Sequence, residues 1–599
     1  MADAVRVEAL FREARGLCQR GLIAQGVDLL EEAIALDPTQ ARSHRLLGMA
    51  LAQIGRHQEA LVSLDRAIVL GAVDADGSRA DTLVALGRLD EAIASFDRAL
   101  AVDPNSVADW CNRGAALLDL SRAAEAAESF DRAIALAPDF AEAHYNRGNA
   151  LMALAQHAQA LASFDRALAL NPGSVDALNN RANALDRLDR QPAALASVEA
   201  ALAFAPANAG ALITRAVLLR KLRRSAEALA GCELVLAAKP QDVDALTVYS
   251  DVLIDLERFD DAIAVLDRLI ALQSDAVGAM WNKSLICLGC GRFREGWPLY
   301  EHRWAAAKGL VPRPYPQPRW NGARVEGPLL IWGEQGLGDE ILHASMIPDL
   351  IARTPSIVLE AEPRLVPLFA RSFPAVRVIP VQAELYAGPI LAQEPLGGLG
   401  RTFRTRWDDF PRREQGYLVP DTARAQALRH RLATDGVAVI GISWVSKAPI
   451  GGASKSAQLA DLEPLLRLPN CRFVDLQYGD TSEERAALAR DLGITVERLP
   501  DIDNTNDLDG LAALMAACDA VVTVSNTTAH LAGALGRPTW VMVPYGHARI
   551  WYWFHDCDMS PWYARTRVRR QRSGEPWREV VARVAQEVSP FIASTPSQA

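Results

Sequence analysis

An acidic residue recurs at a nearly constant spacing through the first half of this 599-residue chain. The spacing is 34 residues, except for 32 residues between the second and third positions, and the series is Glu31, Asp65, Asp97, Asp131, Asp165, Glu199, Glu233 and Asp267. A unit of this length holds two helices that cannot bury their apolar faces alone, so neighbouring units must stack on one another. The period therefore predicts an α superhelix with a concave groove.

Other residue types follow the same period. Glycine occurs early in the repeat and proline closes it, at Gly48, Gly114 and Gly148 and at Pro38, Pro104, Pro138, Pro172, Pro206 and Pro240. Paired amphipathic helices with this pattern resemble the tetratricopeptide repeat. The resemblance implies a repeat array over residues 1–290 that binds an acceptor or partner polypeptide. We expect the 32-residue step to alter the curvature near residues 71–78.

Asparagine recurs at one register of the repeat. An asparagine inside a helix lowers helix propensity, so its recurrence needs a reason. If this register faces the groove, the carboxamides can bind an extended polypeptide backbone. Such an arrangement resembles the asparagine ladder in the tetratricopeptide domain of the eukaryotic protein O-linked N-acetylglucosamine transferase; repeat duplication that copied a tolerated asparagine is the alternative. The predicted acceptor-binding residues are Asn112, Asn146, Asn180 and Asn282.

Composition changes after the repeats. Residues 291–304 indicate a capping helix with an aromatic seam, in which Trp297 and Trp304 are expected to be interface core. Residues 311–318 contain four prolines, which exclude a helix interior and predict a stiff connector. We therefore expect a capping helix and a proline-rich linker over residues 291–327.

The second half opens with a predicted strand, Pro328–Gly333, and a glycine-rich turn. The turn places Asp339 at the start of a helix and at the carboxyl edge of a sheet, where open α/β folds bind ligands. Gly336 and Gly338 let a substrate approach the backbone closely. The pattern lacks the Lys-Ser/Thr of a Walker loop and the dinucleotide GxGxxG. Asp339 is a candidate catalytic carboxylate, and a carboxylate that only complements the helix N-terminus is the alternative.

A second strand, turn and helix lie near the end of the chain. Residues 520–524 predict a buried strand, residues 529–535 a short helix and residues 539–543 another strand. Between the first strand and the helix stands the cluster Ser525, Asn526, Thr527 and Thr528. Hydroxyls and free N–H groups at a helix N-terminus favour a phosphate. The cluster predicts a phosphate-binding turn, with a simple helix cap as the alternative.

Two lysines lie in one loop after the predicted strand over residues 436–444. The chain has six lysines against 57 arginines, and Lys447 and Lys455 both lie in this loop. Lysine presents a compact, mobile charge that suits phosphate, whereas arginine offers a fixed fork. We predict that one of them contacts the departing phosphate or an acidic sugar, and a solvated surface charge is the alternative. Gln477, at the end of the predicted strand over residues 473–478, is expected at the same edge.

Together the two turns resemble a known enzyme family. Gly338-Asp339 followed by Glu-Ile-Leu-His343, and Ser525-Asn-Thr-Thr-Ala-His530 followed by Leu-Ala-Gly-Ala-Leu-Gly536, resemble the bacterial heptosyltransferase superfamily of GT-B glycosyltransferases. The resemblance implies a GT-B domain with halves at residues 328–424 and 425–599, the second of which binds a nucleotide-sugar. It implies Asp339 as general base and donor phosphates held around His530. Heptosyltransferases usually have Asp-Thr at Ser525-Asn526, so the donor is left open.

Composition excludes several classes of protein. The net charge of −10 argues against a general nucleic-acid binder. No segment has the roughly 18 uncharged apolar residues of a membrane helix, and the first residues lack a basic-then-apolar signal, so we expect a cytoplasmic protein. The spacing of Cys287 and Cys290 has no partner pair, and we expect both to pack in a helix. Asp501-Ile-Asp503 is expected in a loop, and no metal ligand is predicted.

The combined prediction is a protein O-glycosyltransferase with a tetratricopeptide superhelix and a metal-independent GT-B domain. The full combination resembles bacterial tetratricopeptide glycosyltransferases, including those that modify flagellin, which implies flagellin as acceptor and a CMP-nonulosonic acid as donor. The predicted catalytic residues are Asp339 and His530, and the predicted donor-binding residues are Gly336, Gly338, Lys447, Lys455, Gln477, Ser525, Asn526, Thr527 and Thr528. A glycosyltransferase of lipopolysaccharide or capsule assembly and a non-catalytic scaffold with a vestigial GT-B half are the alternatives.

Overall fold

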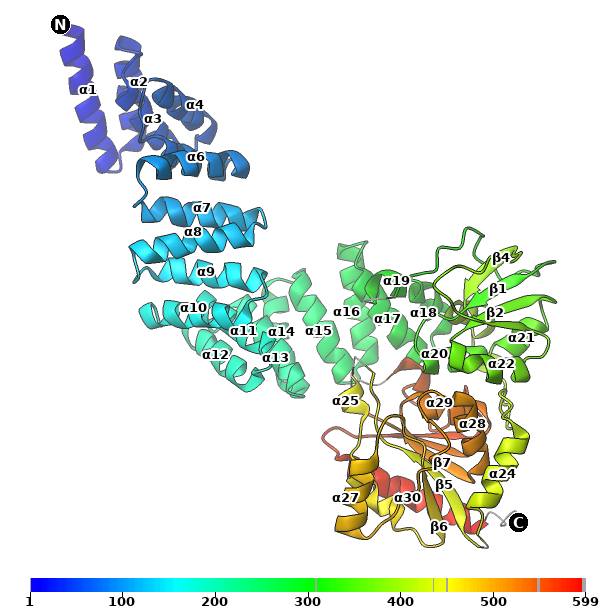
Figure 1. Cartoon of the computed structure of the whole chain (residues 1–599). Coiled ribbons are helices and arrows are strands. Elements are labelled where there is room, and N and C mark those ends of the chain that lie inside the picture. Colours follow the sequence, from blue (N-terminus) through cyan, green and yellow to red (C-terminus); the bar gives the residue numbers. More distant parts are fainter. Residues whose placement is uncertain (1, 308–309, 435, 449–450, 547–549, 595–599) are drawn as a thin grey trace. The chain divides into compact units, whose positions relative to one another are not determined.

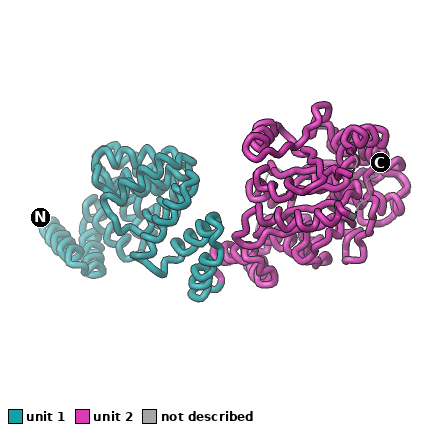
Figure 2. Tube along the Cα trace, turned by 90° about the horizontal axis from the view of Figure 1, so that it is seen from below, with its two compact units in different colours: residues 1–240 teal, residues 241–599 magenta. Residues whose placement is uncertain are grey.

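The computed structural model describes residues 2–307, 310–434, 436–448, 451–546 and 550–594. The chain divides into two compact units, Met1–Pro240 and Gln241–Ala599, which are coloured separately in Figure 2. Each unit is described by itself.

Unit 1 is a stack of antiparallel helix pairs (Figure 1). Its helices are α1 (Ala2–Gln19), α2 (Ile23–Leu36), α3 (Ala41–Gln53), α4 (His57–Val69), α5 (Asp76–Ala85), α6 (Leu89–Val102), α7 (Val107–Asp119), α8 (Ala123–Leu136), α9 (Ala141–Ala153), α10 (His157–Leu170), α11 (Val175–Arg187), α12 (Gln191–Phe204), α13 (Ala209–Lys221) and α14 (Ser225–Ala238). The predicted helix pairs are confirmed.

The repeating glycines explain how closely the two helices of a pair approach. Gly114 on α7 faces Phe130 on α8, and a Cβ added at Gly114 would lie 2.7 Å from the ring. Gly48 contacts Leu64 and Gly148 contacts Phe164 in the same way. In each case the large side chain stands 16 residues after the glycine in the sequence. Glycine therefore makes room for a large buried side chain, and its recurrence is a packing requirement.

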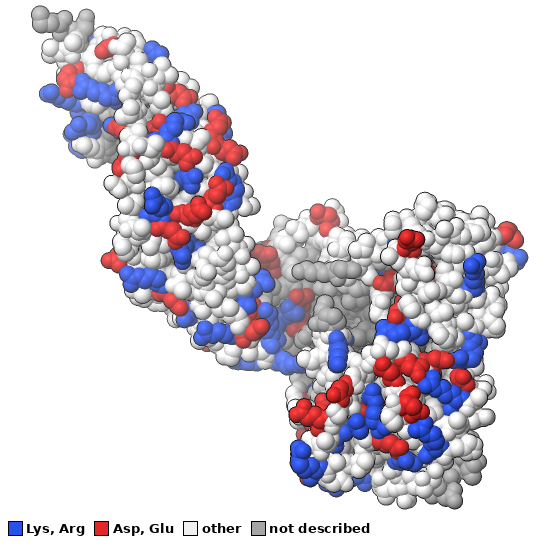
Figure 3. Space-filling model, in the orientation of Figure 1, with Lys and Arg blue, Asp and Glu red and all other residues white. Residues whose placement is uncertain are grey.

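The acidic register has a structural role between repeats. Four of these acids, each on the second helix of a pair, form ion pairs with a basic side chain on the first helix of the next repeat, at 2.5–2.7 Å: Arg79–Asp65, Arg113–Asp97, Arg147–Asp131 and Arg181–Asp165. Acidic and basic side chains are accordingly interspersed over the visible face of the repeats (Figure 3). The acids are about half exposed, so each pair contributes little free energy and the ladder mainly fixes register.

Unit 2 begins with further repeat helices. They are α15 (Val243–Asp255), α16 (Phe259–Leu272), α17 (Val277–Gly289), α18 (Phe293–Tyr300) and α19 (Arg303–Ala306). The predicted capping helix is α18, and the predicted boundary at residue 290 falls inside unit 2. The division of the chain at that residue stays a prediction.

An aromatic seam joins these helices to the rest of unit 2. Trp297 is buried and donates from Nε1 to the Arg404 carbonyl at 2.6 Å. Phe259 stacks on His555 with ring centroids 3.7 Å apart. Trp297 is thus interface core, as the sequence predicted, and the last repeats share one core with the residues that follow.

The rest of unit 2 holds two open parallel sheets with helices packed against them (Figure 1). The first has strand order β3-β2-β1-β4, and the second has β6-β5-β7-β8-β9. The strands are β1 (Leu329–Trp332), β2 (Ile357–Ala361), β3 (Arg377–Pro380), β4 (Ala392–Pro395), β5 (Ala438–Ser443), β6 (Cys471–Asp475), β7 (Ala520–Val524), β8 (Thr539–Val543) and β9 (Thr566–Arg570). Both sheets are of the Rossmann-like type, and the finer GT-B assignment stays a prediction.

Helices and short 3₁₀ turns connect the strands. The α-helices are α20 (Leu337–Ala344), α21 (Ile347–Ile351), α22 (Val366–Ser372), α23 (Gly400–Phe403), α24 (Thr422–Leu432), α25 (Gly452–Lys455), α26 (Glu463–Leu466), α27 (Ser482–Leu492), α28 (Leu508–Ala517), α29 (Thr527–Ala534) and α30 (Trp577–Ser594). The 3₁₀ turns are η1 (Pro363–Leu365), η2 (Leu396–Leu399), η3 (Trp407–Asp409), η4 (Leu459–Leu462) and η6 (Trp551–Trp553).

Register and burial explain the apolar runs seen in the sequence. Leu329 pairs with Ile357 on one side and with Ala392 on the other, and Val521 pairs with Thr539. Every residue of β1, β7 and β8 is buried, as expected for parallel strands covered on both faces. Among the described helices, none combines the length and apolar character needed to cross a membrane.

Candidate functional site

The two predicted turns meet in unit 2. The first follows β1 and leads into α20, the second follows β7 and leads into α29, and α20 packs directly against α29. A Cβ added at Gly338 would lie 2.9 Å from Cδ2 of His530, so only glycine leaves room for the imidazole here. Two motifs about 190 residues apart in the sequence therefore form one site at the carboxyl edges of both sheets.

Asp339 lies in the first turn of α20 and is half-buried. Burial, and then the nearby Glu334 carboxylate, raise the pKa of Asp339 to about 6. A carboxyl group with such a pKa accepts a proton more readily than an ordinary aspartate and is still ionised near neutral pH. Asp339 thus has the acid–base property that a general base needs.

Glu334 is held by its own partners. Its Oε2 accepts from Arg303 Nε at 2.8 Å, and its Oε1 accepts from the Gly397 backbone N–H at 2.7 Å. The Arg303 guanidinium is fully buried and lies over the rings of Tyr300 and Trp304. The end of the repeat helices therefore holds in place the carboxylate that raises the Asp339 pKa.

His530 is enclosed by aromatic rings. It is 1% exposed, stacks on Trp553 with ring centroids 5.2 Å apart, and has Nδ1 2.9 Å from the Tyr563 hydroxyl. Burial lowers the His530 pKa to about 3, so the imidazole is neutral at physiological pH. A Tyr563 hydroxyl that donates to Nδ1 leaves the proton on Nε2, and His530 then acts as a neutral hydrogen-bond donor.

The first two residues of the polar cluster support the turn itself. Asn526 caps α29 by accepting from the Ala529 N–H at 3.3 Å, and it donates to Ser443 Oγ at 2.7 Å. Ser525 Oγ accepts from Trp553 Nε1 at 2.8 Å. These contacts use the polar atoms of both side chains within the fold, in agreement with the helix-cap alternative for this part of the cluster.

Thr527 and Thr528 are different. Within the described residues, neither their hydroxyls nor their backbone N–H groups form a hydrogen bond, although Thr528 is buried. These donors stand at the N-terminus of an eight-residue helix, where the backbone carries partial positive charge. They are available to a bound anion.

The two lysines of the loop lie in different surroundings. Lys455, at the end of α25, is 6% exposed and forms no ion pair or hydrogen bond with any residue that the structure describes. Burial lowers its pKa, and the Asp339 carboxylate opposes that effect, so the two groups lie close enough to interact. Lys447 is exposed, with Nζ 5.7 Å from the centre of the Tyr478 ring. Of the two lysines, Lys455 is the one whose charge interacts with that of Asp339.

Gln477 connects β6 to the start of this loop. Its Oε1 accepts from Ser443 Oγ at 2.8 Å and from the backbone N–H groups of Trp444 and Val445 at 3.0 and 2.8 Å. The amide is buried and positions the loop from within the sheet. A direct contact of Gln477 with a donor stays a prediction.

The asparagine register is partly engaged inside the array. In unit 1, Asn112 donates to Asp81 at 2.9 Å and Asn180 donates to Asn149 at 2.8 Å, while Asn146 has no hydrogen bond to another described side chain. In unit 2, Asn282 donates to Asp251 at 3.5 Å. Three of the amide groups thus donate to the preceding repeat, and binding of an acceptor polypeptide by these asparagines stays a prediction.

Sequence reasoning missed several members of the site. Tyr300, Arg303, Glu334 and Tyr563 contact the predicted residues or their partners. Glu334 stands five residues before Asp339 in the same glycine-rich turn, and this position in the sequence could have identified it as a member of the site. Tyr300 and Arg303 come from the segment that the sequence assigned to a capping helix with an aromatic seam.

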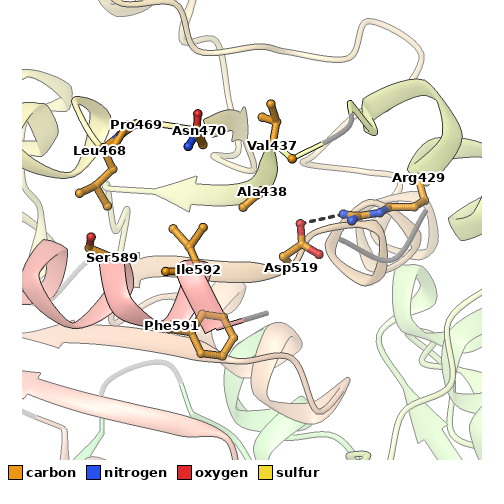
Figure 4. A pocket seen from close by; sticks show the side chains of 12 residues that line it. Arg429, Val437, Ala438, Leu468, Pro469, Asn470, Asp519, Ser589, Phe591 and Ile592 are labelled. Carbon is orange, nitrogen blue, oxygen red and sulfur yellow. Dashed lines mark hydrogen bonds and ion pairs between the residues drawn. The ribbon is translucent and has the colours of Figure 1, made fainter. Parts of the chain in front are cut away.

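A separate cavity of about 310 Å³ opens at the opposite edge of the second sheet (Figure 4). It lies beside the start of β5 and the residue before β7, and an Arg429–Asp519 ion pair of 2.9 Å lines it. Because β5 and β7 run parallel, this is the amino edge, away from Asp339 and His530.

Comparison with known proteins supports the helical repeats. Tetratricopeptide-repeat family models match residues 11–76, 78–141 and 250–295, and a further one matches residues 141–174. The chain is 35% identical over 332 residues to Protein FlbA of Caulobacter vibrioides, which covers 52% of this chain and 55% of FlbA. The chain therefore spans little more than half the length of this relative.

Two solved structures overlap part of the chain. YrrB, described as a TPR protein with an unusual peptide-binding site, is 22% identical, with a TM-score of 0.27, 32% of this chain and 98% of YrrB covered. A tetratricopeptide repeat protein from Parabacteroides merdae is 16% identical, with a TM-score of 0.34, 41% of this chain and 97% of that chain covered. The N-terminal helices of this chain are tetratricopeptide repeats, and two Rossmann-like parallel sheets follow them.

Proposed function

We propose that this protein is a glycosyltransferase that moves a sugar from a nucleotide-sugar to a Ser or Thr hydroxyl of a polypeptide. The observation that carries the proposal is the buried Lys455, which forms no ion pair or hydrogen bond with a described residue and whose charge interacts with that of Asp339. A buried ammonium group is costly unless anions compensate it, and the Asp339 carboxylate acts on Lys455 without forming a direct ion pair with it. A donor phosphate supplies the missing negative charge.

The neighbouring groups fit an anion of this kind. The free N–H groups and hydroxyls of Thr527 and Thr528 and a neutral His530 donor are fixed dipoles on α29, and the Lys455 charge acts on His530. Such preorganised donors stabilise the charge that develops on a leaving phosphate, and they need no reorganisation when the bond breaks. The reaction is therefore proposed to proceed without a metal ion.

Asp339 is proposed as the general base. It removes the proton from the acceptor hydroxyl as the oxygen attacks the anomeric carbon, while the electron pair of the sugar–phosphate bond moves to the phosphate. Glu334 favours proton uptake because its negative charge raises the Asp339 pKa. A positioned base of this kind typically accelerates a reaction by about 10²–10⁴-fold.

The repeats make a polypeptide the preferred acceptor. A superhelix of tetratricopeptide repeats offers an extended concave surface, and the asparagine carbonyl oxygens can accept from a bound backbone. Flagellin is the acceptor that the sequence resemblance favours, and a CMP-nonulosonic acid is the donor that goes with it. Both identities belong to the proposal, as does a cytoplasmic location.

Substitution of each of the two loop lysines tests the proposed donor site. Binding of CMP, UDP and GDP to the purified protein is measured by calorimetry for the wild type, Lys455→Met and the control Lys447→Met. We expect Lys455→Met to weaken binding of the preferred nucleotide by about 10-fold or more, as for loss of a charged hydrogen bond, and Lys447→Met to change it little. Equal affinities in Lys455→Met and the wild type would falsify the assignment of Lys455 to the phosphate.

A further inference from the structure

A tyrosine of the 3₁₀ turn η6 lies inside the candidate site. Tyr552 is 5% exposed, and its ring stands edge-on to His530, with centroids 4.8 Å apart and planes at 76°. Trp551 and Trp553 flank it at 5.7 and 5.5 Å. Since His530 also touches Gly338, Tyr552 is one ring away from the residue that precedes Asp339.

The Tyr552 hydroxyl differs from those of other buried tyrosines in unit 2. Those of Tyr300, Tyr315, Tyr417 and Tyr563 each have a hydrogen-bond partner within the fold. Within the described part of the chain, the Tyr552 hydroxyl has none, and it is not among the fully enclosed side-chain atoms that lack a partner. The oxygen of this buried ring therefore keeps access to solvent, and the fold leaves it available to a bound ligand.

The surroundings decide which role the hydroxyl can play. Burial, and then the charge of Asp339, raise the Tyr552 pKa well above its ordinary value. The phenol therefore stays protonated while Asp339 is ionised, and it can donate a hydrogen bond to a negatively charged oxygen. Its ring packs on His530, which is the proposed hydrogen-bond donor to the phosphate, and the charge of the proposed base Asp339 acts on its hydroxyl.

We propose that the Tyr552 hydroxyl donates a hydrogen bond to the donor phosphate, at the oxygen that gains negative charge as the sugar–phosphate bond breaks. This inference rests on the proposed transferase function and adds a residue to its site. Tyr552 keeps its proton throughout: the acceptor proton goes to Asp339, and the electron pair of the broken bond stays on the phosphate. The hydroxyl thus lowers the barrier as a fixed dipole.

Tyr552→Phe is the variant that isolates this contact. Phenylalanine keeps the ring that packs on His530 and removes only an oxygen without a partner in the fold, so the melting temperature should not fall. We expect kcat to fall by about 10²–10³-fold, as for loss of one preorganised donor to a developing charge. The KM for the polypeptide acceptor should stay within about twofold, because the hydroxyl is assigned to the donor.

Tyr315→Phe is the matched control. The Tyr315 hydroxyl contacts Glu360 and accepts from the Tyr386 N–H, both at 3.0 Å, and it lies outside the candidate site. Its loss should lower the melting temperature and leave kcat unchanged, because Glu360 and the Tyr386 N–H then lose a hydrogen-bond partner. The two variants therefore have opposite expected effects on stability and turnover.

The outcomes separate the two levels of the proposal. A wild-type protein that transfers sugar, together with Tyr552→Phe at the wild-type rate, overturns the role of Tyr552 alone. A clear drop in the melting temperature of Tyr552→Phe also overturns it, because the hydroxyl then has a partner in the protein. A wild-type protein that transfers no sugar to any acceptor from CMP-, UDP- or GDP-sugars overturns the transferase function itself.

Discussion

Replacing Asp339 with asparagine should stabilise the protein at alkaline pH while removing its activity. The folded protein raises the pKa of Asp339 from 3.8 to about 6. The ionised form is therefore less favourable in the folded state than in the unfolded state. Below about pH 4 both states bind the proton and nothing is lost, and the stability falls as the pH rises through about 6.

The size of this effect follows from the two pKa values. They differ by about two pH units, and each pH unit corresponds to about 1.4 kcal/mol, so ionisation of Asp339 costs about 3 kcal/mol above pH 7. Asparagine has nearly the same shape and does not ionise. Asp339→Asn should thus be up to about 3 kcal/mol more stable than the wild type at pH 8 and only about 1 kcal/mol more stable at pH 4.5.

Tryptophan fluorescence during urea unfolding measures this difference in the right part of the chain. Of the 13 tryptophans, only Trp110 lies in unit 1, so the signal reports mainly on unit 2. Asp244→Asn changes an exposed carboxyl group of unit 2 and should alter stability by less than about 0.5 kcal/mol at either pH. If Asp339→Asn is less stable than the wild type at pH 8, or if the difference does not change between pH 4.5 and 8, the account of the Asp339 environment is wrong.

Other perturbations test the packing and the charge pair. Gly114→Ala should cost about 1–3 kcal/mol in thermal unfolding, because the added Cβ would overlap the Phe130 ring. The control Gly210→Ala should be neutral or stabilising, because its Cβ would meet its nearest atom only at 3.5 Å. Equal effects of the two substitutions would refute the packing role of the repeating glycine. Arg303→Met leaves Glu334 buried without its charge partner and should cost about 3–5 kcal/mol at pH 8. Because burial raises the Glu334 pKa, the loss should become smaller as the pH falls and the carboxylate takes up a proton, and a loss independent of pH would contradict this.

The sequence predicted the elements that repetition and burial specify. The 34-residue period identified the helix pairs, and the apolar run at residues 520–524 matches β7 because a strand buried on both faces admits few polar side chains. The turn after β7 was also predicted, since a polar cluster between a buried strand and a short helix can form little else than a turn that caps the helix. These signals are local, so they are visible in one sequence.

The contacts that assemble the site come from distant parts of the chain. Arg303 reaches Glu334 from the end of the repeat helices, and Tyr563 reaches His530 from the segment before β9. No local pattern marks either residue, because each acts only through its partner in space. The same limit left Lys447 and Lys455 equivalent in the sequence, and burial and the charge interaction with Asp339 separate them.

The most direct test of the proposed function is intact-mass spectrometry of flagellin, and of the wider proteome, from cells that lack the protein and carry either the wild type or Asp339→Asn. The account predicts mass increments of a sugar on flagellin with the wild type and none with Asp339→Asn, although the variant protein accumulates normally. Sugar increments that persist with Asp339→Asn would contradict the catalytic role of Asp339, and an identical proteome with and without the wild-type protein would contradict protein glycosylation.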